Sequence, residues 1–282
     1  MSARETAIAD GEDVSAKLNT LTAAQVEFYR DHGWLRIPVV FTRAETDELA
    51  DHLDWAIEIW AGKDAGWSGP WRKKYMDAPT EKKSKLIALH DLQFYSDAWM
   101  RAITHRKLCG AMADLLGPAV ALHHSTLHVK PPETGHPFPM HQDWAFYKHN
   151  DDRYVDCLVH LDDTCHENGE IRFLDGSHKL GILEHVTKDE EGRDCTPHLP
   201  TDKYFLKDTV PVPAKAGDVV IFNILTIHGS YINTTNRNRR LVRIGYKHPE
   251  NVQTEGQSKN RPTWIVWGHR QRRDGMVAYT TE

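Results

Sequence analysis

The tripeptide His141-Gln142-Asp143 places an imidazole and a carboxylate two residues apart. Residues i and i+2 of a strand point to the same side, so at the end of a strand both groups reach one point in space. These groups are two of the three ligands in the 2-His-1-carboxylate triad, which binds non-heme Fe(II) and leaves coordination positions open. Because the tripeptide is also common in proteins without a metal, the prediction of a metal site needs a third ligand.

His228 is the candidate for that third ligand. It closes the apolar segment that starts at Asp218, and Gly229-Ser230 follows it directly. An imidazole at the end of a buried strand can project into a cavity, although a single histidine there is more often a core residue bonded to the backbone. We predict His141, Asp143 and His228 as the ligands of one metal ion.

Arg239 follows His228 by eleven positions. A guanidinium holds a carboxylate through two parallel hydrogen bonds, which lysine cannot do. In an Fe(II) oxygenase this suits the distal carboxylate of 2-oxoglutarate, to which Ser230 can add a hydrogen bond. The alternative is that Arg237, Arg239 and Arg240 form a solvated basic turn.

Arg243 shares a strand face with Arg239 if the segment is extended. A cation inside a sheet structure needs a partner, which can be the substrate, the cosubstrate or a protein carboxylate. The first choice makes Arg243 a substrate contact and favours an anionic substrate. Four other residues are candidate substrate contacts: Trp144, Tyr147, Lys130 and His128. The alternatives are plain packing for the two aromatic residues, a loop-edge position for Lys130 and a hydrogen-bonded core or rim imidazole for His128.

Helices that support these residues are predicted in the first half of the chain. Thr22 with Gln25 and Thr42 with Glu45 are capping-box patterns, which mark helix starts. Gly33 suits the end of the first helix, and a short strand follows from Trp34. A third helix is expected over about 97–116, and the segment 62–70 reads as a loop rich in glycine and tryptophan.

Short strands are predicted after Pro118, separated by turn signals such as Asn168-Gly169 and Asp175-Gly176. The expected strands cover 120–130, 154–161, 169–174, 218–225 and 240–247. A helical part followed by a run of short strands predicts an α+β chain whose body is a β-sandwich or barrel.

Several modest motifs occur in a characteristic order along the chain. They are the opening segment 21–38, Val129-Lys-Pro-Pro, His141-Gln-Asp-Trp, Glu167-Asn-Gly, Gly176-Ser-His-Lys, Gly217-Asp-Val-Val and Ile227-His-Gly-Ser. In this order the chain resembles the phytanoyl-CoA dioxygenase family of Fe(II)/2-oxoglutarate oxygenases over about 21–247. The resemblance implies a mainly β fold with flanking helices, a cupin-like jelly roll or double-stranded β-helix. The expected divisions are a frayed tail over 1–20 and one domain over 21–282, with helices over about 21–117 and the β core over about 118–250.

The resemblance also implies the reaction and its cofactors. Fe(II), 2-oxoglutarate and O2 would hydroxylate an unactivated C–H bond of a small metabolite, releasing succinate and CO2, and the same chemistry can desaturate or cyclise. No catalytic residue is expected beyond the metal ligands. The family often has a tryptophan lining the cosubstrate where this chain has Val159, so we expect different packing on that wall.

Composition narrows the other possibilities. The 282 residues carry a net charge of −5 and 18 histidines, an acidic balance that argues against a nucleic-acid partner. Neither a secretory signal nor an apolar run of membrane-spanning length is visible, and the four cysteines form no C-x-x-C pair. We therefore expect a cytoplasmic protein with reduced cysteines and a small-molecule partner.

Two other functions fit some of the same residues. One is a zinc or manganese hydrolase or isomerase on a jelly roll, which gives Arg239 no special role. The other is a small-molecule binder that keeps the fold without the chemistry, against which an intact triad argues. Neither the substrate nor the oligomeric state is predicted.

Overall fold

The helices begin where the capping motifs place them. The computed structural model describes residues 18–270. Thr22 and Thr42 each complete a capping box, with Gln25 and Glu45, and Gly33 ends the first helix at φ 80°. The helices are α1 (Ala23–His32), α2 (Arg43–Ile59), α3 (Arg72–Tyr75), α4 (Ala78–Lys83), α5 (Asp97–Ile103) and α6 (Arg106–Leu116).

The third predicted helix is wrong as a single element, because α5 and α6 divide it. The chain turns at Thr104, which has φ −99° and ψ 11°. The carbonyl of Ile103 accepts hydrogen bonds from the hydroxyl of Tyr246 (2.8 Å) and the thiol of Cys109 (3.3 Å). Side chains thus occupy the oxygen that would otherwise continue the helical ladder.

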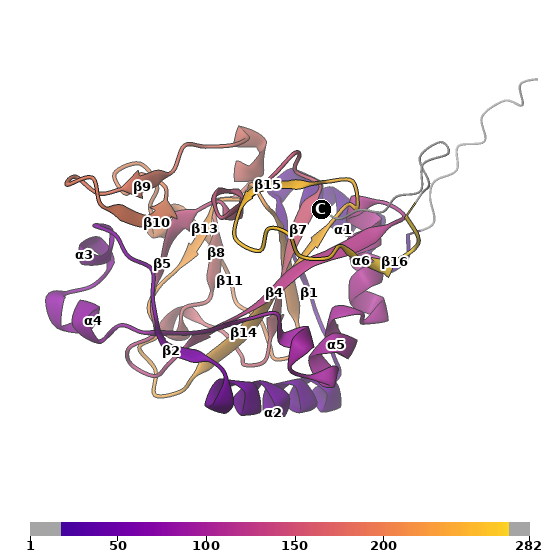
Figure 1. Cartoon of the computed structure of the whole chain (residues 1–282), viewed down its shortest axis with the longest axis horizontal. Helices are drawn as coiled ribbons and strands as arrows, with labels where there is room; N and C mark the ends of the chain where they lie inside the picture. The colour runs from indigo at the N-terminus through magenta and orange to yellow at the C-terminus, as the bar shows by residue number, and fades with distance from the viewer. Residues whose placement is uncertain (1–17, 271–282) are drawn as a thin grey trace, which may run out of the picture.

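Two antiparallel sheets form the body of the protein (Figure 1). The larger sheet has the order β1 (Trp34–Ile37), β12 (Val219–Asn223), β7 (Tyr154–His160), β14 (Arg239–Lys247), β4 (Val120–Lys130), β3 (Leu86–His90) and β2 (Gly62–Ala65), with β16 (Trp264–Trp267) also paired to β4. The smaller sheet has the order β11 (Val210–Val212), β8 (Ile171–Phe173), β13 (His228–Ser230) and β5 (Phe138–His141). Two further pairs are β9 (Val186–Lys188) with β10 (Asp194–His198) and β6 (Tyr147–His149) with β15 (Gln253–Gly256).

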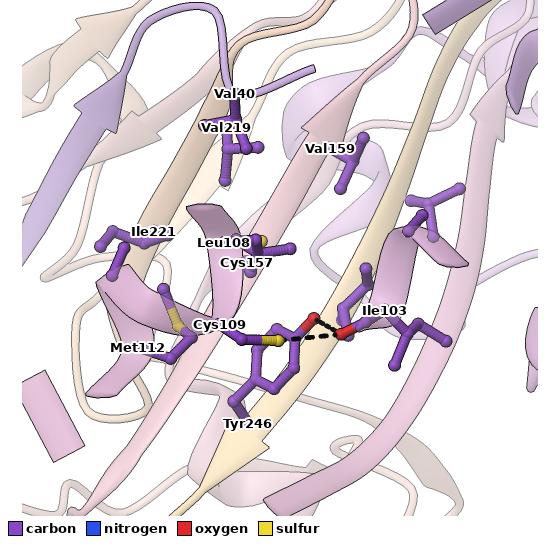
Figure 2. Close-up of a cluster of buried hydrophobic side chains, with 14 of the residues drawn as sticks. Val40, Ile103, Leu108, Cys109, Met112, Cys157, Val159, Val219, Ile221 and Tyr246 are labelled. Atoms are coloured by element: carbon purple, nitrogen blue, oxygen red, sulfur yellow. Dashed lines mark hydrogen bonds between the residues drawn. The ribbon is translucent and has the colours of Figure 1, made fainter. Parts of the chain in front are cut away.

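The central strands of the larger sheet, including β7 and β12, are buried along their whole length. Its outer face packs against α1, α2, α5 and α6 to form the main core. Figure 2 shows part of this core, with Cys157 and Val159 from β7 beside Ile221 from β12 and Met112 from α6. The inner face meets the smaller sheet, where Leu158 packs with Phe173. Alternation along each strand therefore divides its residues between the helices and the interior of the sandwich.

The ends of the described chain are tied to this body. Asn19 and Thr20, at the edge of the expected tail, donate backbone hydrogen bonds to Asp114 at 2.7 and 2.9 Å, while residues 1–17 lie outside the described residues. Beyond Pro249, Trp264 and Trp267 on β16 pack against the main core. Among the described helices, none has the length and apolar character needed to cross a bilayer.

Truncating the core should cost far more stability than removing its buried hydroxyl. Leu108 is 0% exposed, so we expect Leu108→Ala to lower the free energy of unfolding by about 2–5 kcal/mol through lost burial and a residual cavity. Tyr246→Phe should cost only about 1 kcal/mol, because the Ile103 carbonyl keeps its thiol donor. Urea denaturation measures both changes.

The matched control is Ile182→Ala, since Ile182 is 56% exposed and should change stability by less than about 0.5 kcal/mol. Equal losses for Leu108→Ala and Ile182→Ala would contradict this description of the core.

Candidate metal centre and its two cavities

The pairing of β5 with β13 brings two histidines together. His141 lies directly opposite His228 in this antiparallel pair, and their ring centroids are 4.1 Å apart. The sequence argument that His228 closes the long apolar strand is wrong, because β12 ends at Asn223 and a turn precedes β13. The turn reverses the chain, which moves His228 from the larger sheet into the smaller one.

Asp143 reaches the same point by a bend rather than by strand alternation. β5 ends at His141, and Asp143 opens a short 3-10 turn over Asp143–Ala145. Its Oδ1 atom lies 3.4 Å from Nε2 of His141 and 3.8 Å from Nε2 of His228. Among the described residues, these three form the one cluster of potential metal-ligand groups, with their atoms within 4.8 Å of one another.

Backbone carbonyls set the orientation of both imidazoles. Nδ1 of His141 donates to the Pro139 carbonyl at 2.7 Å, and Nδ1 of His228 donates to the Thr226 carbonyl at 2.9 Å. Because a carbonyl can only accept, the neutral rings turn an Nε2 lone pair toward Asp143. Burial lowers the pKa of His228 to about 3, which favours this neutral form. Two imidazole nitrogens and one carboxylate oxygen fit Fe(II).

Asp143 is negatively charged despite its burial. It is 1% exposed, and burial by itself would raise its pKa. The Arg243 guanidinium, whose Nη1 lies 2.7 Å from Oδ2 of Asp143, is the main opposing influence and holds that pKa well below its usual range. The carboxylate is therefore ready to bind a cation at any pH near neutrality.

Arg239 lies in the cavity that contains the triad. It is 2% exposed, and within residues 18–270 no hydrogen-bond partner meets its Nε or Nη1 atoms. Burial lowers its pKa to about 10, so it keeps its charge at neutral pH. A buried cation with free donors is costly unless an anion completes it. Ser230 lines the same cavity, and its hydroxyl accepts from Lys130 Nζ at 2.7 Å.

A second cavity adjoins the first at Asp143. Four residues line both cavities: Trp67, His128, Asp143 and Arg243. The second cavity adds Leu86, Ala88, His90, Thr126, Phe146 and Gln257, among others. On β14 and β4 the pairs Arg239–Lys130, Leu241–His128 and Arg243–Thr126 follow one another in register. The interior thus has an Arg239 end and an Arg243 end, with the triad between them.

Trp67 closes the site from the glycine- and tryptophan-rich loop. Its ring lies edge-on to His141 at a centroid distance of 4.8 Å. Nε2 of His136 accepts from the Trp67 backbone N–H (3.1 Å) and from Nη1 of Arg72 (2.7 Å), and the same Arg72 atom donates to the Trp67 carbonyl. We call this arrangement of Trp67, Arg72 and His136 the loop clasp.

Of the other four predicted substrate contacts, only His128 lines either cavity. His128 lines both cavities, whereas Trp144 lines neither. Trp144 packs in an apolar cluster with Phe146 and donates from Nε1 to the His149 carbonyl at 3.5 Å. Tyr147 is fully buried and bonded to Asp156 and Arg243. Lys130 is also fully buried, and its Nζ atom donates to Ser230 and to the Tyr231 carbonyl; burial, followed by the charge of Arg239, lowers its pKa well below the usual value.

The placement of Val159 on the cosubstrate wall is wrong. Its side chain belongs to the core under the helices (Figure 2), while Leu158 lines the cavity. A shift of one residue in register exchanges the two faces of a strand. Trp67, His90 and Thr126 were not selected from the sequence, although Thr126 stands two positions before His128 and so shares its face.

Comparison with known proteins agrees with this geometry. The family model for phytanoyl-CoA dioxygenase (PhyH) matches residues 29–241. A probable alpha-ketoglutarate-dependent hypophosphite dioxygenase of Stutzerimonas stutzeri is 30% identical over 235 residues, covering 79% of this chain and 78% of that protein. The L-proline trans-4-hydroxylase of Streptomyces griseoviridis is 26% identical over 251 residues, covering 82% and 88%.

Solved structures support the predicted fold. The alpha-ketoglutarate-dependent carbocyclase SnoK of nogalamycin biosynthesis has a TM-score of 0.67 at 21% identity, covering 84% of this chain and 88% of that one. EctD of S. alaskensis, with 2-oxoglutarate and 5-hydroxyectoine, has a TM-score of 0.65 at 21% identity, covering 90% and 86%. The predicted jelly roll with flanking helices is confirmed.

The loop clasp should weaken in acid. His136 must be neutral to accept from Arg72, and burial, followed by the Arg72 charge, lowers its pKa to about 4 from 6.5. Between these values the unfolded chain binds more protons, so the stabilisation is complete above pH 6.5 and declines as the pH falls toward 4. The free energy of unfolding should fall between pH 7 and pH 5 in both proteins. We expect the fall to be about 1–2 kcal/mol smaller in His136→Asn than in wild type.

Urea denaturation at both pH values measures this difference, with the exposed His166→Asn as control. The same pH dependence in wild type and His136→Asn would show that the clasp histidine is not held neutral.

Proposed function

The chain belongs to the phytanoyl-CoA dioxygenase family, and from this premise we propose that His141, Asp143 and His228 bind Fe(II) while Arg239 and Ser230 bind 2-oxoglutarate. The protein is a 2-oxoglutarate-dependent non-heme iron dioxygenase that acts on a small molecule. The observation that carries the residue assignment is the buried Arg239 guanidinium, whose free donors open into the cavity of the triad.

Two kinds of anchor would hold the cosubstrate. Arg239 would take its distal carboxylate through parallel hydrogen bonds, and the Ser230 hydroxyl, itself held by Lys130, would add a further contact. Lys130 would therefore act beside the cosubstrate rather than on the substrate. When bound, Fe(II) and 2-oxoglutarate supply the oxidising chemistry that consumes O2, releases succinate and CO2, and hydroxylates the substrate.

The protein's own contribution is orientation and the exclusion of water. The Pro139 and Thr226 carbonyls aim the two imidazoles. Apolar side chains, including Leu158, Ile171 and Phe222, line the cosubstrate cavity and keep it dry. Trp67 covers His141 from outside the sandwich.

The second cavity is the proposed substrate site. It shares Asp143 with the cosubstrate cavity, so a molecule bound there lies next to the metal ligands. Thr126, His128 and His90 provide polar contacts, while Trp67 and Phe146 provide apolar walls. Such a mixture suits a small molecule that is oriented by a few polar groups.

A small acidic metabolite is the proposed substrate class. Support comes from relatives named as a hypophosphite dioxygenase and a methylphosphonate hydroxylase. Arg243 supports it less than its sequence position implied, because its guanidinium already pairs with Asp143. Among the described residues lining the second cavity, Asp143 is the only carboxylate, so an anion would meet little repulsion there.

The four free cysteines support the proposed cytoplasmic location.

Removing the Arg239 guanidinium should weaken cosubstrate binding selectively. We expect Arg239→Met to raise the KM for 2-oxoglutarate by about 30-fold, equivalent to about 2 kcal/mol of charge-assisted hydrogen bonding. Mn(II) binding, used as a probe of the triad, should stay within about twofold of wild type. Titration calorimetry with Mn(II) and steady-state kinetics with 2-oxoglutarate measure the two effects.

Arg240→Met is the matched control, because Arg240 pairs with Asp162 and Asp54 outside the cavities. An unchanged KM for 2-oxoglutarate in Arg239→Met would reject the cosubstrate role of this arginine, whereas the rival hydrolase or isomerase predicts that the wild-type protein does not consume 2-oxoglutarate.

Succinate formation by the Fe(II)-loaded protein tests the substrate class. We expect the highest rate with small phosphorus oxyacids or other small acids, measured against neutral and cationic metabolites of similar size. A preference for neutral or cationic molecules would contradict the acidic class, and failure to bind 2-oxoglutarate at all would contradict the proposed function.

A further inference from the structure

The two oxygens of Asp143 have different surroundings. Oδ1 faces the two Nε2 atoms of His141 and His228, at 3.4 and 3.8 Å. Oδ2 accepts a hydrogen bond from Nη1 of Arg243 at 2.7 Å. Both partners of this ion pair are buried, with 1% exposure for Asp143 and 7% for Arg243. One oxygen is thus available to a metal ion, and the other is held by a cation.

We propose that Arg243 is a positioning residue that restricts Asp143 to coordination through Oδ1 alone. The proposal rests on the metal-ligand role of Asp143 given above. A carboxylate can bind a metal ion through one oxygen or through both. Coordination by both would occupy a position that an Fe(II) oxygenase needs for 2-oxoglutarate or O2. By holding Oδ2, Arg243 keeps that position open.

Arg243 is itself held from several sides. Its Nη1 also donates to the Tyr147 hydroxyl at 2.9 Å, and its Nη2 donates to Nε2 of His124 at 3.2 Å. The Tyr147 hydroxyl donates in turn to Asp156 at 2.8 Å, and Nε of Arg243 lies 3.8 Å from the other Asp156 oxygen. A side chain with this many fixed neighbours has little rotamer freedom, as precise placement of a ligand requires.

The support behind His124 has a consistent direction of hydrogen bonding. A guanidinium only donates, so Nε2 of His124 accepts and its N–H is on Nδ1. This Nδ1 lies 2.8 Å from Nδ1 of His123, which the Tyr154 hydroxyl also contacts at 2.7 Å. Nε2 of His123 then donates to Oε1 of Gln253 at 2.8 Å. The Gln253 amide nitrogen donates to the carbonyls of Glu255 and Gln257, which fixes that orientation. The chain runs from β15 at the surface to the metal ligand.

The contrast with Arg239 separates the tasks of the two buried arginines. Both point inward from β14, but within residues 18–270 the Nη1 atom of Arg239 has no partner, while Nη1 of Arg243 has two. An arginine with free donors suits an incoming anion. Arg243 bonds both of its terminal nitrogens to protein groups and, within residues 18–270, leaves only Nε without a hydrogen bond, which suits a structural task within the site.

The test compares Arg243→Met and Arg243→Lys with Arg240→Met, which removes an arginine from the same strand. Mn(II) affinity, measured by electron paramagnetic resonance, should fall by about 10- to 100-fold in Arg243→Met, as for lost partners of metal ligands elsewhere. Arg243→Lys keeps the charge without the fork, so it should give an intermediate loss. Arg240→Met should bind Mn(II) as wild type does.

A second readout reports the coordination itself. The visible charge-transfer absorption of the anaerobic Fe(II)–2-oxoglutarate complex should shift or weaken in both Arg243 variants and stay unchanged in Arg240→Met. A variant that merely loses stability would bind less metal without altering the absorption of its folded fraction. Because Arg243→Lys conserves charge and size, it provides the measurement if Arg243→Met does not fold.

The two proposals fail in different ways. If His141→Ala binds Mn(II) as tightly as wild type, the metal centre itself is wrong. If His141→Ala abolishes binding but both Arg243 variants keep wild-type affinity and absorption, only the positioning role is overturned.

Discussion

The cost of burying charge in the sandwich is the constraint on which this site depends. Asp143, Arg239 and Arg243 are each 7% exposed or less, and a charge removed from water needs a partner. Arg243 satisfies Asp143, and Ser230 with a backbone carbonyl receives Lys130. Within residues 18–270, Arg239 keeps Nε and Nη1 without a hydrogen-bond partner, which is the arrangement that an incoming anion would complete.

Strand alternation allows one sheet to carry both the core and the chemistry. On β14, Val242, Ile244 and Tyr246 pack under the helices, while Arg239 and Arg243 face the cavities. The helices therefore do more than shield apolar surface. By packing against alternate residues they fix the strand that carries both arginines, so the spacing of the charged groups follows from the rigidity of the core.

Local signals were the predictable part of this structure. The capping boxes at Thr22 and Thr42 involve contacts within one helical turn, and both are confirmed. The order of motifs led to the family and the fold. Contacts between distant segments were harder to predict from the sequence. The division of the third helix depends on Tyr246, and the sheet face on which Val159 lies depends on the register of the sheet. Trp67 could not be placed because the two rings that fix its position in the site, Phe138 and His141, are more than seventy positions away.

The position of β3 has an evolutionary consequence. Its residues Leu86, Ala88 and His90 line the second cavity and are absent from the described lining of the cavity that holds Arg239. Substitutions on β3 can reshape the proposed substrate cavity while the proposed 2-oxoglutarate site around Arg239 is preserved. The architecture is thus modular, and a lineage can acquire new substrates without rebuilding the machinery that activates oxygen.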